Sequence, residues 1–187
     1  MYDAMVAEMQ SVLSMKVFKW AKMPLKAKPI STRMVLKTKL LADGSFDKHK
    51  ARLCVRGFMQ KEGVNYNDTF TPTSDLNVFR SLLSHSALHN WSVKHADIKN
   101  AFCQACIDVE NLFITMPNGI VFHDPNPNPN SERRGIVLEK ALYGLKQSPR
   151  LFYLDIKKHL EANGVLSNRR DHTAFTYTSK KGARKPV

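Results

Sequence analysis

Two strand-like segments joined by a turn, over residues 33–56, place the strongest constraint on the fold. RMVLKTKL and HKARLCVR alternate in part between apolar and basic residues, and Asp43-Gly44 between them supplies the chemistry of a tight turn. Side chains two residues apart in a strand share a face, so Lys50, Arg52 and Arg56 are expected on one face, where they suit phosphate contacts. The alternative is a solvated edge strand that its charge protects from further pairing.

Three segments have the apolar spacing of helices. They are residues 2–15, residues 75–90, with Asp75 or Ser74 as the N-terminal cap, and residues 148–164, with Pro149 at the start and Gly164 at the end. The apolar stripe of the second consists of Leu76, Phe79, Leu82, Leu83 and Ala87.

Strand patterns are interleaved with these helices. We expect an irregular segment over 59–75 and a short helix over 100–106. The Pro/Asn-rich residues 124–135 are expected to form an exposed, extended linker. Further strands are expected at 91–98, at 111–122 as two strands around a turn at 117–119, at 136–142 and at 175–179. This mixed order predicts an α+β or α/β domain, with α+β as the fold class.

The net charge of +13 is unevenly distributed along the chain. Residues 16–61 carry +11, residues 62–132 carry −5, and residues 133–187 carry +9. Two basic segments around an acidic one suit a polyanion held on both sides of a metal centre. A solvated basic surface around an ordinary acidic stretch explains the same charges.

Apolar runs and cysteines indicate where the protein resides. No apolar run approaches the roughly 20 residues that span a bilayer, and the first residues lack the pattern of a signal peptide. The 3 cysteines are an odd number, which argues against a disulfide framework. We therefore expect an intracellular protein without a membrane partner, either cytoplasmic or nuclear.

Two positions could carry chemistry by their own context. Asp97 follows the strand predicted over 91–98 and precedes a short helix, which is a common position for a metal ligand and also for a helix N-cap. Gly144, in ALYGLKQSPRLFY, could let a backbone approach a ligand closely, or could belong to a plain strand-to-helix connection.

Long ordered motifs carry a family resemblance. In chain order they are KPISTRMVLKTKL, KARLCVRGFMQKEGVNYNDTFTP, WSVKHADIKNAF, ALYGLKQSPRLFY and DHTAF. On these motifs the chain resembles the reverse transcriptase domain of copia-type retrotransposon polyproteins over nearly its whole length. The resemblance implies a right-hand polymerase, with basic fingers over about 16–75 and part of the palm over about 76–187.

The resemblance also implies roles for individual residues. Asp97 matches the first catalytic aspartate, a ligand of Mg²⁺ in two-metal nucleotidyl transfer. Around the incoming deoxynucleotide, the matching positions are Arg52 and, more weakly, Lys39 at the triphosphate, Ile98 by its backbone, Phe102 against the ribose 2′-hydroxyl, and Tyr143, Gly144 and Gln147 beside the base pair. Lys50, Arg56 and Arg150 would contact the RNA template or the DNA primer strand.

Part of the expected catalytic machinery is missing from the sequence. The family pattern continues into a Tyr-x-Asp-Asp hairpin, whereas these 187 residues contain no Asp-Asp pair, and Asp171 matches a position outside that pair. Two Mg²⁺ ions need carboxylates from both places. We therefore expect a fragment of a polyprotein that does not polymerise alone.

Two other interpretations stay open. The sequence could be a non-catalytic nucleic-acid-binding remnant, or a retrotransposon relic without function. A zinc site built from His85, His89, Cys103 and Cys106 is a weaker alternative, because the order of the ligands is the reverse of that in a zinc finger.

Overall fold

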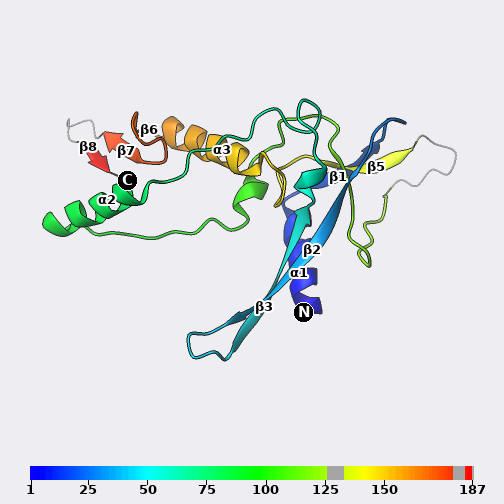
Figure 1. Ribbon diagram of the computed structural model, residues 1–187, viewed down its shortest axis with the longest axis horizontal. Coiled ribbons are helices and arrows are strands. Elements are labelled where there is room, and N and C mark those ends of the chain that lie inside the picture. Colours follow the sequence, from blue (N-terminus) through cyan, green and yellow to red (C-terminus); the bar gives the residue numbers. More distant parts are fainter. Residues whose placement is uncertain (126–132, 179–183, 187) are drawn as a thin grey trace. The chain divides into compact units, whose positions relative to one another are not determined.

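The computed structural model describes residues 1–125, 133–178 and 184–186 (Figure 1). The chain divides into two compact units, each described by itself below. Unit 1 comprises Met1–Thr69 and Asn100–Phe152, and unit 2 comprises Phe70–Lys99 and Tyr153–Val187. This division leaves the expected boundary between fingers and palm near residue 75 as a prediction.

Unit 1 contains a five-stranded mixed sheet in the order β1-β5-β4-β2-β3. Strands β2 and β4 are parallel, and the other neighbouring pairs are antiparallel. The elements are α1 (Tyr2–Ser14), β1 (Phe18–Lys22), β2 (Ile30–Leu40), β3 (Phe46–Val55), the 3-10 helices η1 (Gly57–Met59) and η2 (Ala101–Gln104), β4 (Phe113–Thr115) and β5 (Arg134–Leu138). The predicted hairpin is confirmed as β2 and β3, which form a long ribbon in Figure 1.

The register of the hairpin places basic side chains on one face. Lys37 lies opposite Lys50, and Lys39 lies opposite Lys48. Because directly opposed residues share a face and alternate residues return to it, this face is made of Arg33, Val35, Lys37 and Lys39 on β2 and Lys48, Lys50, Arg52 and Cys54 on β3. We call it the basic face. Like charges directly opposite one another destabilise a sheet, so this pairing costs stability.

The hydrophobic core of unit 1 lies between α1, the sheet, η2 and the segment that follows β5. Val12 of α1 packs in the same cluster as Leu53 of β3 and Leu142. The largest side chains that are fully buried include Phe113, Leu53, Leu112 and Leu142. The apolar stripe of α1 therefore contributes to the core, as its sequence pattern predicts.

Unit 2 contains α2 (Leu76–Leu88), the antiparallel strands β6 (Val165–Ser167), β7 (Phe175–Thr178) and β8 (Arg184–Pro186), and most of α3 (Ser148–Ala162). Asp75 is the N-cap of α2, because its Oδ1 accepts a hydrogen bond from Asn77 N at 2.8 Å. No residue of α2 is buried. The apolar stripe predicted on this helix is thus present but exposed.

The three predicted helices are confirmed, and several strand predictions are not. Residues 91–98 form no strand, because a strand requires a partner and none of the described strands pairs with this segment. The side chains of these residues are exposed. Of the two strands expected over 111–122, only β4 forms, and residues 120–124 are irregular. Strands β1, β6 and β8 were not predicted, although FKWAK in β1 has a strand-like alternation.

The prediction of an extended linker over 124–135 is wrong at the C-terminal end of that range. Arg134 and Gly135 belong to β5, and the Arg134 guanidinium pairs with the Asp124 carboxylate at 2.5 Å. Residues 126–132 lie outside the described part of the chain. The described residues thus form a mixed α and β fold, and no helix among them is long and apolar enough to cross a membrane.

Candidate functional site

The two most specific sequence motifs are joined in unit 1. Val55, in KARLCVRG, donates its backbone N–H to the carbonyl oxygen of Tyr143, in ALYGLKQSPR, at 2.8 Å. Cys54 and Tyr143 form a parallel bridge at the same point. Segments almost 90 residues apart thus share a backbone contact at the edge of β3 that does not pair with β2.

Two glycines allow this contact. A Cβ atom on Gly144 would lie 2.1 Å from the carbonyl oxygen of Val55, and one on Gly57 would lie 2.1 Å from the carbonyl oxygen of Gly144. Gly144 also has a φ of +88°, which side chains disfavour. Gly144 is therefore required for a close approach of two backbones, and we call this contact the glycine crossing.

A buried amide pair fastens the glycine crossing. Gln60 Nε2 donates to Gln147 Oε1 at 2.9 Å, and Gln147 Nε2 donates to the carbonyl oxygen of Asn65 at 2.9 Å. Gln60 Oε1 accepts the backbone N–H of Lys146 at 2.8 Å. Gln147 is fully buried, so its expected role beside a base pair would act through the backbone that it holds. That role stays a prediction.

A lysine–tyrosine contact and an ion pair join the same segments at the surface. Lys146 Nζ lies 3.2 Å from the Tyr66 hydroxyl and 4.7 Å from the centroid of its ring. The Arg150 guanidinium pairs with the Asp68 carboxylate at 2.8 Å. A nucleic-acid phosphate at Arg150 would have to compete with Asp68.

Beside the glycine crossing, three sequence-predicted residues come together. The Arg52 guanidinium carbon lies 5.3 Å from the centroid of the Tyr143 ring, and the rings of Phe102 and Tyr143 meet edge to face at 5.1 Å. Arg52 is exposed, and both rings are half-buried. We call these residues the arginine–aromatic cluster. Burial raises the pKa of the Tyr143 hydroxyl, and the positive charge of Arg52 partly offsets that shift.

Glu8 of α1 lies near this cluster and was not predicted. Its Oε1 accepts the backbone N–H of Leu53, the residue after Arg52, at 3.0 Å. The negative charge of Glu8 is also a minor cause of the raised pKa values of Cys54 and Tyr143, for which burial is the largest cause. The contact spans 45 residues, so no local pattern indicated it.

The remaining basic candidates occupy different parts of the hairpin. Lys50 lies on the basic face two residues from Arg52. Lys39 is four residues along β2 from Val35, the partner of Arg52, or about 13 Å away at ~3.3 Å per residue. Arg56 follows the end of β3, where its backbone N–H bonds to the carbonyl oxygen of Ser31 at 2.9 Å.

Asp97 and Ile98 belong to unit 2 and are exposed in the irregular segment before η2. The helix-cap alternative for Asp97 is wrong, because η2 begins at Ala101 with Asn100 as its N-cap. Among the residues that the structure describes, no three His, Cys, Asp or Glu side chains lie together as a metal site. Asp97 alone therefore does not amount to a site for two Mg²⁺ ions.

The histidines and cysteines of the zinc alternative do not come together as a site among the described residues. The rings of His85 and His89 lie 4.4 Å apart in unit 2, but no third ligand joins them among the described residues. Burial raises the pKa of the Cys103 thiol in unit 1 to about 12, which disfavours the thiolate that binds zinc.

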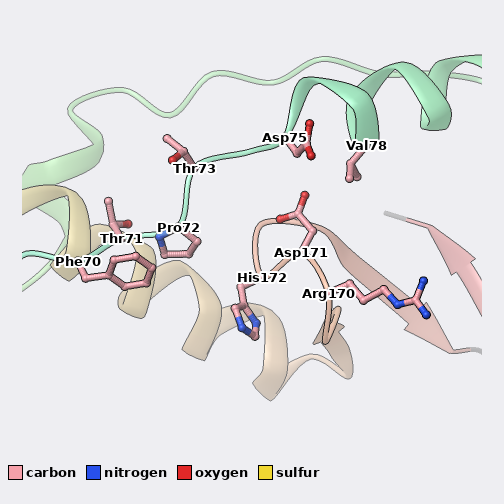
Figure 2. A pocket seen from close by; sticks show the side chains of 9 residues that line it. All are labelled: Phe70, Thr71, Pro72, Thr73, Asp75, Val78, Arg170, Asp171 and His172. Atoms are coloured by element: carbon pink, nitrogen blue, oxygen red, sulfur yellow. The ribbon is translucent and has the colours of Figure 1, made fainter.

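Unit 2 contains a pocket of about 460 Å³ at the start of α2, shown in Figure 2. Asp75 and Asp171 lie close together in it, and Thr173 donates both its backbone N–H and its hydroxyl to Asp171 Oδ1, at 2.8 and 2.6 Å. Both bonds lower the pKa of Asp171, and the bond from the Thr173 hydroxyl is the larger cause. Asp171 thus has a structural role in the turn before β7.

Comparison with known proteins identifies the family. The profile of the reverse transcriptase (RNA-dependent DNA polymerase) family matches residues 15–185. The chain is 31% identical over 146 residues to the retrovirus-related Pol polyprotein from transposon RE1 of Arabidopsis thaliana, which covers 78% of this chain and 10% of that protein. It is 29% identical over 172 residues to the corresponding polyprotein from transposon TNT 1-94 of Nicotiana tabacum, which covers 92% of this chain and 12% of that protein.

The chain therefore belongs to the reverse transcriptase family, and its relatives are Pol polyproteins of copia-type retrotransposons. It spans about a tenth of the length of these relatives. No solved structure matches it significantly.

Proposed function

We propose that this chain is the part of an RNA-directed DNA polymerase that takes up the incoming deoxynucleotide, with fingers formed around the basic hairpin and with part of the palm. Its partners in the working enzyme are an RNA template, a DNA primer strand and deoxynucleotides. The arginine–aromatic cluster is the observation that carries this proposal, since it unites residues from three separate family motifs.

Arg52 suits the triphosphate because a guanidinium donates several charge-assisted hydrogen bonds in a fixed plane. Its contact with Tyr143 holds the guanidinium over a ring without consuming its charge in an ion pair. Phe102 packs against Tyr143 and Phe152, at ring-centroid distances of 5.1 and 6.2 Å. A ring fixed in this way can exclude a ribose 2′-hydroxyl by steric overlap, which selects deoxynucleotides.

Asp97 would supply one carboxylate to Mg²⁺, whose chemistry in this family is to activate the primer 3′-hydroxyl and neutralise the triphosphate. The described residues do not complete a two-metal site, and the sequence has no Asp-Asp pair. We therefore propose that the 187-residue chain alone binds nucleotide without extending a primer.

Binding of a fluorescent deoxynucleoside triphosphate to the purified chain tests this proposal. Arg52→Ala should weaken binding by roughly 10- to 100-fold. This change corresponds to the loss of a hydrogen bond to a charged group, which contributes about 1.5–3 kcal/mol. Arg52→Lys keeps the charge but loses the planar fork, so its affinity should be intermediate. Arg80→Ala, an exposed arginine of unit 2, is the matched control and should bind like the wild type.

Two results would contradict the proposal. One is a wild-type chain that binds no nucleotide, and the other is a wild-type chain that binds equally well after Arg52→Ala. Template-dependent incorporation by the purified wild-type chain would contradict the narrower statement that it does not polymerise alone.

The basic face favours a second candidate function, nucleic-acid binding without catalysis. Two pairs of lysines face each other directly there at a cost in stability, and a bound polyanion would remove that cost. Under this alternative Asp97→Ala leaves RNA binding intact or slightly tighter, and no nucleotide binding is measured. Nucleotide binding that depends on Arg52 would favour the first function over this one.

A further inference from the structure

A pocket of about 520 Å³ lies in unit 1 at the base of the basic hairpin. Its volume is in the range of sites that hold a ligand the size of one nucleotide. The residues that line it are Ser31, Thr32, Arg33, Met34, Arg56, Thr115, Met116, Pro117 and Asn118.

The lining is cationic. Arg33 and Arg56 are both exposed, and neither forms an ion pair with any other described residue. No carboxylate lines the pocket, and its other polar groups are hydroxyls and an amide. Two unpaired guanidiniums among neutral hydrogen-bonding groups form an environment that suits an anion such as a phosphate.

The backbone around the pocket is fixed. Arg56 N donates to the carbonyl oxygen of Ser31 at 2.9 Å, which joins the end of β3 to the start of β2. Thr32 Oγ1 donates to the carbonyl oxygen of Thr115 at 2.6 Å, which joins β2 to β4. Because these bonds hold both arginine-bearing segments, little backbone ordering would be needed when a ligand binds.

Arg33 also belongs to the basic face. From Arg33 to Lys39 the face extends over seven residues of β2, about 20 Å between the first and the last at ~3.3 Å per residue. This length is enough for several consecutive phosphates of a single strand, so the pocket lies at one end of a continuous cationic path.

We propose that this pocket holds one phosphodiester unit of a single-stranded nucleic acid, between Arg33 and Arg56, with the rest of the strand along the basic face. The inference rests on the nucleic-acid binding proposed above and adds its location. Phosphate contacts carry no base information, so the pocket itself discriminates little between sequences.

The test is fluorescence anisotropy of a labelled single-stranded oligouridylate with the full chain, over a series of salt concentrations. The Arg33→Ala/Arg56→Ala double variant should bind more weakly. Its plot of log affinity against log salt should be shallower by about 0.7, since both arginines face the same phosphate and each phosphate neutralised on a single strand contributes roughly 0.7. Arg33→Lys/Arg56→Lys should restore the slope but only part of the affinity.

Arg80→Ala/Arg169→Ala is the matched control, because it also removes two positive charges, but from exposed positions of unit 2. Its affinity and slope should remain those of the wild type. Circular dichroism of each variant shows that it is folded, which is expected because all four side chains are exposed.

The outcomes separate this inference from the proposed function. A wild-type chain that binds no oligonucleotide contradicts nucleic-acid binding itself. Wild-type binding that the Arg33→Ala/Arg56→Ala change leaves unaltered overturns the pocket alone. Unlabelled uridine monophosphate could also compete as effectively as unlabelled oligonucleotide at the same concentration of phosphate groups. That result would assign the pocket to a free nucleotide and overturn the strand proposal.

Discussion

Units 1 and 2 differ sharply in how they bury apolar side chains. Nearly all the buried apolar residues of the described chain belong to unit 1, and Val165 is the exception in unit 2. In α2 the side chains of Leu76 and Phe79 are 56% and 53% exposed, although the helix has a regular apolar stripe. A strong local pattern therefore makes a helix in both units, but it makes a core only in unit 1.

The difference lies in contacts between distant segments. In unit 1 the glycine crossing, the Gln60–Gln147 pair and the Glu8–Leu53 bond each join segments at least 45 residues apart. In unit 2 the hydrogen bonds of α2 and of the turn before β7 are mostly local among the described residues, such as those from Asn77 to Asp75 and from Thr173 to Asp171. Most of the free energy of unfolding should thus come from unit 1, which also contains the arginine–aromatic cluster.

The largest effect should come from Gly144→Ala. The new Cβ would overlap the carbonyl oxygen of Val55 and would also meet an unfavourable φ, so unfolding of unit 1 should become easier by about 4 kcal/mol or more. Denaturant unfolding followed by hydrogen exchange in unit 1 measures this.

Gly63→Ala is the control for that change. Gly63 also has a positive φ, of +72°, but a Cβ there meets nothing within 4 Å. It should cost only about 1 kcal/mol, the penalty for the left-handed conformation. Equal losses in the two variants would mean that the glycine crossing does not hold unit 1 together.

A pair of truncations tests the comparison of burial directly. Leu53→Ala removes a fully buried side chain and should cost about 2–5 kcal/mol, from lost transfer energy and a cavity. Phe79→Ala removes a half-exposed ring from α2 and should cost about 1 kcal/mol or less. A larger loss at Phe79, measured by denaturant unfolding, would show that α2 packs in solution and would contradict the contrast between the units.

A smaller effect is expected at Glu8. Glu8→Ala leaves the N–H of Leu53 without its partner, which should cost about 1–3 kcal/mol. Glu8→Gln keeps a carbonyl oxygen that can accept this bond, so most of the stability should return, while the pKa of Tyr143 should fall because a negative charge is removed. Thermal unfolding and ultraviolet titration measure the two effects. Equal destabilisation by both substitutions would assign the role of Glu8 to its charge.

The smallest effect concerns the pH dependence of unit 2. The pKa of Asp171 is lowered in the folded state, so its carboxylate stabilises the fold above the unfolded pKa of about 4, and this contribution is lost as the pH falls through the folded value. The difference in thermal stability between the wild type and Asp171→Asn should therefore narrow on acidification. Asp108→Asn, an exposed position of unit 1, is the control, and a difference that widens in acid would reverse the assigned sign.

Local patterns predicted much of the fold and little of the site's geometry. The turn at Asp43-Gly44 and the alternation around it predicted the hairpin, but not the shift in its register between Lys39 and Leu40. The strand predicted over 91–98 fails because a strand depends on a partner that its own residues do not encode. The glycine crossing and the Glu8 contact were missed for the same reason, since each depends on where a distant segment passes.

Hydrogen exchange of the wild-type chain with and without a deoxynucleoside triphosphate and Mg²⁺ tests whether nucleotide binds to unit 1 at the arginine–aromatic cluster. We expect added protection in residues 50–57 and 141–147 and none in α2. Protection confined to α2 and the rest of unit 2, or no change anywhere at saturating nucleotide, would contradict binding at this cluster.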